Sequence, residues 1–230
     1  WAADLGHDAA PAAGASTDHA PAAEPTASAG DEAAGFLTLH ALRIKGMATV
    51  ETITALAGIE ADTARRHLDA LVEQGAATFM EPRSMWVLSA EGREAHGPVL
   101  ADAVAGLDLA GLPYERFLAL NGDFKLLCTD WQLKDGEPND HQDPAYDAAI
   151  VARLGEFDDQ AKPVVASIGQ AIPWMAGYGA RLQAARSRFE GGDQKGLTGV
   201  MCDSYHDVWM ELHEDLILSQ GIDRAQEGSF

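Results

Sequence analysis

Basic side chains are scarce in this sequence of 230 residues. It has 16 Lys and Arg against 36 Asp and Glu, which gives a formal net charge of −20 at pH 7. Proteins that coat nucleic acid bind its phosphates through a broadly basic surface. The composition excludes a chain of that kind, although it leaves room for a small basic patch.

Cysteines and long apolar runs are also missing. The two cysteines, Cys128 and Cys202, form no Cys-x-x-Cys motif, so we expect free thiols rather than a disulfide framework. No run of 18 apolar residues is present, which excludes a membrane-spanning helix. The first Lys or Arg is Arg43, so the basic start of a signal peptide is absent. These absences predict a cytoplasmic protein.

The sequence lacks the common signatures of catalytic sites. It has no GxGxxG, Walker A, HExxH or GxSxG motif. Cys128 has no recognisable activating base, so a buried thiol is the expected state. The acidic loop 135–143 does not have the spacing of a calcium-binding EF-hand. We therefore expect no catalytic residue, no metal and no cofactor.

The first residues have the composition of a linker. Residues 1–34 are dominated by Ala, Pro, Ser, Thr, Gly, Asp and Glu. Such a segment cannot bury enough apolar surface to offset the entropy lost on ordering. We expect a disordered tail or linker here and a short tail at 223–230. Because the chain begins with Trp1 and linkers join domains, an upstream domain of a longer protein is also expected.

Residues 35–98 carry the signals of a compact domain. Helical patterns cover 36–45 and 50–57, and Asp62 is a candidate N-cap for a third helix that stops at Gly75.

Strand-like runs follow the third helix. ATFM and MWVL flank a tight turn, Glu81 to Ser84, and Ser89 opens another helix. This order predicts a winged helix-turn-helix, in which the third helix is shaped to enter a major groove.

The stretch DTARRHLDALVEQGAATFMEPRSMWVLSAEGRE resembles the winged-helix transcriptional regulators of the MarR and ArsR type. Ala76 and Ala77 depart from the family, which usually has Leu-Val or Leu-Ile there. The likeness covers only this region of the chain, so it indicates fold more than function. The residues that match the family pattern are Thr63, Ala64, Arg66, His67, Leu68, Leu71, Gly75, Leu88, Ser89 and Gly92.

The resemblance implies a DNA-binding regulator that acts as a homodimer. Its expected DNA contacts are Thr63, Arg65, Arg66 and His67 on the third helix and Arg83 on the wing. Between positions 36 and 96, however, six basic residues face eight acidic ones, a net charge of −2. A winged helix used for contact with another protein therefore stays as the alternative.

After a connector at 99–113, residues 114–222 show four helical patterns. Apolar residues recur at three- and four-residue steps over 117–131, 146–161, 164–189 and 201–216, with Pro163 starting or kinking the third helix. Four amphipathic helices of this length fit an antiparallel bundle. The predicted fold is mainly α.

The last helix carries the other candidate site. His206 and His213 lie seven residues apart with Trp209 between them, which suggests a polar or small-ligand site. The simpler interpretation places both histidines at the margin of the buried face. A metal site is not supported because a single helix supplies too few ligands. The acidic stripe Asp203, Asp207, Glu211 and Glu214 is interpreted as a solvated face, or as a docking surface for a basic partner.

A second, looser resemblance concerns the helical domain. LNGDFKLLCTDWQ and SYHDVWMELHEDLI resemble uncharacterised actinobacterial proteins in which a winged helix and this domain occur together. Some of these also carry a phosphoenolpyruvate-utilising domain like that of pyruvate phosphate dikinase. The resemblance implies an alternative function, a non-catalytic C-terminal module of a phosphotransfer protein whose winged helix contacts another protein.

Overall fold

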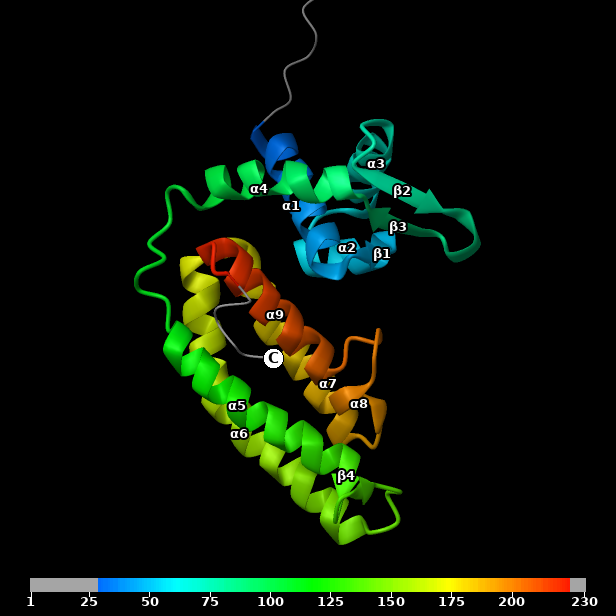
Figure 1. The fold of residues 1–230 in the computed structure, drawn as a ribbon, viewed down its shortest axis with the longest axis vertical. Helices are drawn as coiled ribbons and strands as arrows, with labels where there is room; N and C mark the ends of the chain where they lie inside the picture. Colours follow the sequence, from blue (N-terminus) through cyan, green and yellow to red (C-terminus); the bar gives the residue numbers. More distant parts are fainter. Residues whose placement is uncertain (1–28, 224–230) are drawn as a thin grey trace, which may run out of the picture.

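The computed structural model describes residues 29–223 and is mainly helical, as the sequence predicts. It has an N-terminal unit, residues 29–104, and a bundle, residues 114–220, joined by an extended connector (Figure 1). Most of the two predicted tails, 1–28 and 224–230, lies outside the described residues. Within 29–223 no helix is both long and apolar enough to cross a membrane.

The first helix begins earlier than the sequence pattern predicts. The expected tail 1–34 is wrong for 29–34, because these residues form the start of helix α1 (Ala29–Lys45). Asp31 and Glu32 lie in its first turn, where negative charge interacts favourably with the helix dipole. The polar, alanine-rich composition concealed a helix that tertiary contacts stabilise.

Local capping explains the next elements. Helix α2 (Val50–Ala57) follows strand β1 (Met47–Ala48). The Thr49 hydroxyl caps its start by accepting a hydrogen bond from the Thr52 amide, and the helix ends at Gly58, whose φ is +67°. Helix α3 (Ala61–Glu73) follows. Its N-cap residue is Glu60, so the prediction of Asp62 as N-cap is wrong by two positions.

A small antiparallel sheet completes the N-terminal unit. Strands β2 (Ala77–Met80) and β3 (Met85–Leu88) lie where the sequence predicts them, joined by the 3-10 turn η1 (Glu81–Arg83). The strand order is β1-β3-β2, so β3 is central. Phe79 is paired with Trp86, whose ring is buried in the core with Ile53 and Leu68.

Helix α4 (Ala90–Val104) packs on α1, and its first turn lies close to the residue before β2. The Ser89 hydroxyl accepts a hydrogen bond from the Gly92 amide and so caps the helix, which begins where the sequence predicts. A Cβ on Gly92 would lie 2.1 Å from the carbonyl oxygen of Ala76, so only glycine allows this approach. Because α4 extends to Val104, the predicted connector 99–113 is wrong for its first six residues.

The helices of the bundle run alternately down and up (Figure 1). A small hairpin separates the first two, and a 3-10 segment separates the next two. In chain order the elements are α5 (Tyr114–Gln132), β4 (Leu133–Lys134), β5 (Glu137–Pro138), α6 (Pro144–Ala171), η2 (Pro173–Gly177), α7 (Tyr178–Glu190), α8 (Lys195–Thr198) and α9 (Tyr205–Gln220).

Helix α6 joins two patterns that the sequence analysis separated at Pro163. The proline lies exposed inside a continuous helix, so a carbonyl freed by it can be hydrated. Phe157, Ala161 and Ile168 continue one buried face across it. Burial of that face outweighs the local cost of proline, and the chain breaks at η2 instead.

Aromatic side chains fill the centre of the bundle. The Trp209 ring stacks on Phe117 at 4.7 Å between centroids, and Phe124 and Phe157 contact its other sides. Its indole N–H donates to Asn121 Oδ1 at 3.0 Å, which satisfies a buried polar pair. Trp209 is therefore a core residue.

Candidate nucleic-acid interface and domain junction

Helix α3 presents its charged face to solvent. Arg65 and Arg66 are more than half exposed, whereas Thr63 is partly buried. Arg65 Nε lies 3.0 Å from Asp69 Oδ2 on the same helix, and its guanidinium lies 4.8 Å from the centre of the Trp86 ring. Arg65 thus contacts both α3 and the hairpin.

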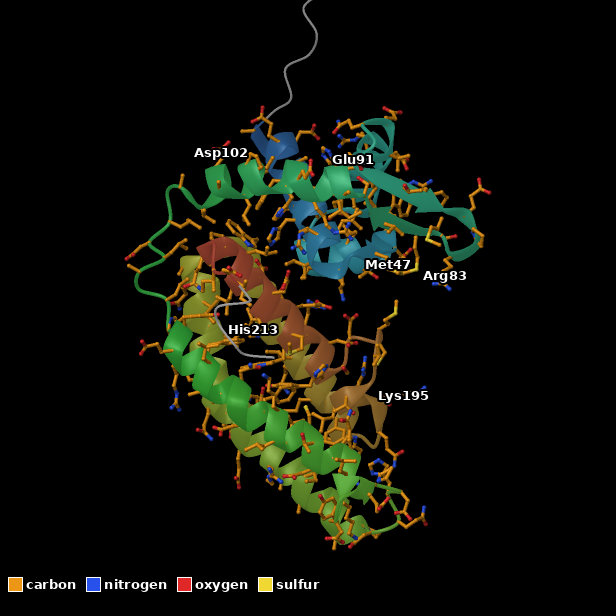
Figure 2. All side chains as sticks on the ribbon, in the orientation of Figure 1. Met47, Arg83, Glu91, Asp102, Lys195 and His213 are labelled. Atoms are coloured by element: carbon orange, nitrogen blue, oxygen red, sulfur yellow. The ribbon has the colours of Figure 1, made fainter. Side chains whose placement is uncertain are left out.

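Asp31 of α1 pairs with two more of the residues predicted to contact DNA, Arg66 and His67. Its Oδ1 lies 2.7 Å from Arg66 Nη1 and 3.3 Å from His67 Nε2. The hydrogen bond from Arg66 holds the pKa of Asp31 below its usual range. Arg83 instead projects from the exposed hairpin (Figure 2). Within the described residues, Arg65, Arg66 and His67 therefore each lie close to a carboxylate.

The bundle covers the opposite side of the N-terminal unit. It contacts α1, α2 and α4, and leaves the outer face of α3 open (Figure 1). At the centre of this junction, His40 Nε2 of α1 lies 2.9 Å from Asp215 Oδ1 of α9. Both side chains are almost fully buried, so this pair joins the two halves out of contact with solvent.

Asp215 is the acceptor for donors from four elements. Besides His40, its carboxylate accepts Trp174 Nε1 of η2 at 3.3 Å and Tyr178 Oη of α7 at 3.2 Å. The Ser219 hydroxyl, one turn along α9, is 3.3 Å from the same carboxylate. A buried carboxylate needs such partners because burial without them costs several kcal/mol. The arrangement fixes α1, η2 and α7 relative to α9.

His96 of α4 extends the network. Its Nε2 lies 2.9 Å from His40 Nδ1, with the two rings stacked at 5.1 Å. Either ring can supply the proton of this hydrogen bond, because an imidazole nitrogen is a donor or an acceptor according to the tautomer. Burial lowers the pKa of His96 to about 4, and the nearby His40 and Arg43 act in the same direction. His96 is therefore neutral at pH 7.

Stability is expected to fall on mild acidification because of His96. Its ordinary pKa is 6.5, so between that value and about 4 the unfolded chain binds a proton that the folded chain does not. The contribution of His96 to the free energy of unfolding is constant above pH 6.5. It falls by about 2–3 kcal/mol as the pH is lowered to about 4. Urea denaturation at several pH values measures the slope.

A variant without an ionisable side chain at position 96 tests whether His96 causes this pH dependence. His96→Gln should flatten the slope between pH 6.5 and 4. Burial also lowers the pKa of the half-buried His206, so His206→Gln is the matched control and should change the slope less. An unchanged slope in His96→Gln would contradict the assigned role of His96.

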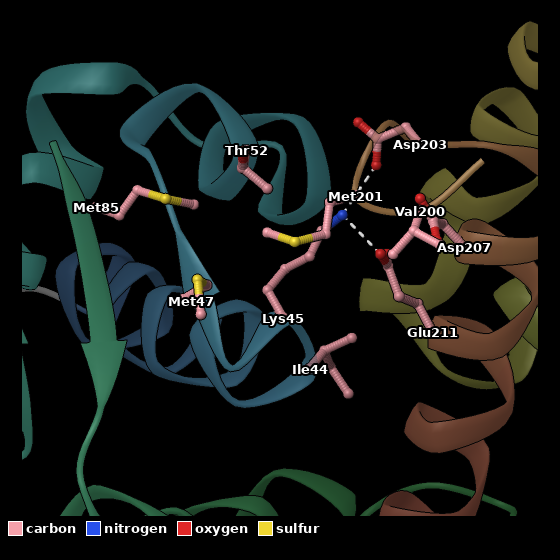
Figure 3. Close-up of a pocket in the computed structure, with 10 residues that line it drawn as sticks. All are labelled: Ile44, Lys45, Met47, Thr52, Met85, Val200, Met201, Asp203, Asp207 and Glu211. Carbon is pink, nitrogen blue, oxygen red and sulfur yellow. Dashed lines mark hydrogen bonds and ion pairs between the residues drawn. The ribbon is translucent and has the colours of Figure 1, made fainter. Parts of the chain in front are cut away.

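A second, more exposed ion network lies beside the buried one. Lys45 Nζ of α1 is 2.9 Å from Asp203 and 2.6 Å from Glu211 (Figure 3). Arg181 of α7 contacts the same two carboxylates. Glu214 contacts Arg43 at 3.2 Å. The interpretation of the acidic stripe as a solvated face is wrong for Glu211 and Glu214, which are only 13% and 19% exposed and pair with basic residues of the chain, whereas Asp203 is still half exposed.

These contacts define the electrostatics of the junction. Burial alone would raise the pKa of Asp203, but Lys45 and Arg181 hold it below its usual range. Next to the network, a cleft of about 200 Å³ separates Met47 and Met85 from Met201 (Figure 3). Met201 is 71% exposed and has a left-handed φ of +56°.

The predicted ligand site on α9 is not assembled. Trp209 and His213 are fully buried, and His213 contacts Phe117 at 5.2 Å between ring centroids. His206, seven residues earlier on nearly the same face of α9, is only partly buried and lies 6.2 Å from Phe124 between ring centroids. The expectation that both histidines lie at the margin is wrong for His213. His206 borders a surface pocket with Asp207 and Glu214, and neither Trp209 nor His213 lines that pocket.

The thiols and metal-type ligands are dispersed. Cys128 and Cys202 are both free, as predicted, and burial raises the pKa of Cys128 to about 12, so it is a poor nucleophile. Over residues 29–223, no three His, Cys, Asp or Glu side chains form a group that could hold a metal ion.

Comparisons with known proteins found no relative of this chain. No protein-family model, no curated protein and no solved structure matches it. The function is therefore inferred from the fold and from the residues described above.

The buried network of His40, His96 and Asp215 was not predicted from the sequence. His40 and His96 are 56 residues apart, and Asp215 is a further 119 residues along the chain. Asp215 belongs to a helix with three other acidic residues, which concealed it. The available signal was its position one residue before Leu216, on the apolar side of α9, where an unpaired carboxylate would be costly.

Proposed function

We propose that the protein is a DNA-binding transcriptional regulator in which residues 35–98 form a winged helix-turn-helix domain. The bundle would dimerise or sense a small molecule. The order α1, α2, α3, β2, β3 with β1 completing the sheet supports the proposed domain. The observation that carries the function is the open outer face of α3 beside an exposed hairpin, the surface that enters a major groove in such domains.

Two carboxylates on this surface, Asp31 and Asp69, compete with DNA for the arginines of α3. DNA phosphates would have to displace Asp31 from Arg66 and Asp69 from Arg65. Exposed ion pairs of this kind contribute only up to about 1 kcal/mol, so phosphate contacts can replace them. The pairs hold the side chains in place until DNA binds.

Arg66→Ala is expected to weaken DNA binding by about 1–3 kcal/mol, the usual effect of losing a base contact. Asp31→Asn should have the opposite sign, because it frees Arg66 and removes one negative charge near the phosphates. A gain of up to about fivefold is expected. Fluorescence polarisation against genomic fragments in about 50 mM salt measures both.

Asp123→Asn is the matched control for the charge. Asp123 is exposed on α5, in the bundle, and the variant loses the same charge far from α3. Its affinity should stay at the wild-type value. If wild-type protein binds no fragment more tightly than a scrambled sequence, the regulator proposal is overturned.

A second candidate function is the non-catalytic module of a phosphoenolpyruvate-utilising phosphotransfer protein. In it, α3 and the hairpin would contact another protein domain. The pairing of Arg65 and Arg66 with carboxylates and the net charge of −20 favour this alternative. Absence of DNA binding, combined with binding of a phosphotransfer domain lost in Arg66→Ala, would support it.

A further inference from the structure

An apolar pocket of about 460 Å³ opens where the N-terminal unit meets the bundle. Its walls come from α1, α2, α4 and η2. No charged side chain lines it, in a chain whose net charge is −20. Its volume falls in the range of small-molecule sites, roughly 300–1,000 Å³. The principal wall residues are Phe36, Leu37, Leu56, Ala57, Ala103 and Trp174.

Two aromatic rings form a corner of this pocket. Phe36 of α1 and Trp174 of η2 are 5.2 Å apart between centroids, with their planes at 78°. A third ring placed against them can stack on one and present its edge to the other, the two arrangements that aromatic groups favour. The corner therefore favours a flat aromatic guest over a flexible aliphatic one.

The buried network holds this corner in shape. The Trp174 indole N–H donates to Asp215, and both rings contact His40, Phe36 at 5.3 Å and Trp174 at 5.7 Å between centroids. A wall fixed before binding loses little conformational entropy when a ligand enters. Without such bonds, two large rings at an open pocket would be free to fold over it.

The rim supplies acceptors but no charge. The last turn of α2, from Ala55 to Gly58, borders the pocket, and the last carbonyls of a helix have no partner within it. They can accept a hydrogen bond from a ligand N–H or O–H. An ionised ligand would lose hydration without a counter-charge, which is costly.

We propose that this pocket binds an uncharged aromatic molecule of one or two fused rings that carries an N–H or O–H donor. Because α1, α2 and α4 belong to one half and Trp174 to the other, the ligand bridges the two halves. The inference rests on the ligand-sensing role proposed for the regulator. Its binding is nevertheless measured without DNA, so either one can fail alone.

Indole is the probe, titrated into the full chain by calorimetry. One site is expected, with a dissociation constant of about 0.1–1 mM for a ligand this small. Indole-3-acetate, which carries a negative charge, should bind at least about tenfold more weakly. No saturable heat with indole overturns the proposal, and equal affinity for the two probes overturns the assignment to uncharged ligands.

Pocket-filling variants locate the site. Ala103→Phe on α4 places a ring in the pocket and should weaken indole binding at least about tenfold by occupying the space. Ala101→Phe adds the same ring to an exposed position of the same helix and should leave affinity unchanged. Should Ala103→Phe fail to fold, Ala55→Phe on the exposed rim fills the pocket from α2. Wild-type affinity in a folded filling variant overturns the proposal.

Discussion

Asp215→Asn is expected to lower the free energy of unfolding by about 3–5 kcal/mol, because it breaks a buried charged network. The carboxylate accepts hydrogen bonds from His40, Trp174 and Tyr178, on three different elements. An Asn side chain keeps one acceptor oxygen for His40 and Trp174 but carries no charge, and its NH₂ group replaces the oxygen that accepts a hydrogen bond from Tyr178. The loss of a charged acceptor shared by several donors is larger than that of a single neutral hydrogen bond.

Urea denaturation followed by circular dichroism measures this loss. Asp159→Asn is the matched control, because Asp159 is 73% exposed and its change should stay within about 0.5 kcal/mol. The network also joins the two halves, so limited proteolysis in the connector at 105–113 should become faster in Asp215→Asn. A destabilisation below about 1 kcal/mol would show that the network does not hold the junction.

Trp209→Ala is expected to cost about 3–5 kcal/mol, the usual effect of removing a fully buried aromatic side chain. The variant leaves a cavity between Phe117 and Phe124 and an acceptor, Asn121 Oδ1, without its indole donor. Trp209→Phe should cost less, since it keeps a ring in the cluster. Both values come from the same urea titrations.

The comparison with an exposed apolar residue tests the position of Trp209. Met201 is 71% exposed, and Met201→Ala should change stability by no more than about 0.5 kcal/mol. If Trp209→Ala lowered the free energy of unfolding no more than Met201→Ala, the Trp209 ring would not be the packing centre of the bundle. A role for Trp209 in ligand binding would then be favoured.

The elements predicted well from the sequence are those with local signals. Helix α2 has a hydroxyl cap at Thr49 and a left-handed glycine at Gly58, and the structure begins and ends it there. The two strands of the hairpin were likewise placed correctly, since a turn around Pro82 separates two short β-forming runs. Caps and turns act through neighbouring residues, so sequence alone reveals them.

The elements predicted wrongly depend on distant contacts. The start of α1 has few apolar residues, yet Asp31 reaches Arg66 and His67 on α3. Helix α6 passes through Pro163 because its buried face continues on both sides. In each case tertiary packing outweighed the local preference from which the boundary was predicted.

By itself the sequence determined the mainly helical composition, the local start and end of α2, and the amphipathic faces that form the bundle. Only the tertiary structure decided which polar side chains are buried together. His40, His96 and Asp215 come from three separate helices, and nothing in the sequence around any one of them indicates the other two. The reason is physical: a buried charge is tolerated only where distant elements bring its partners, and that depends on how the helices pack.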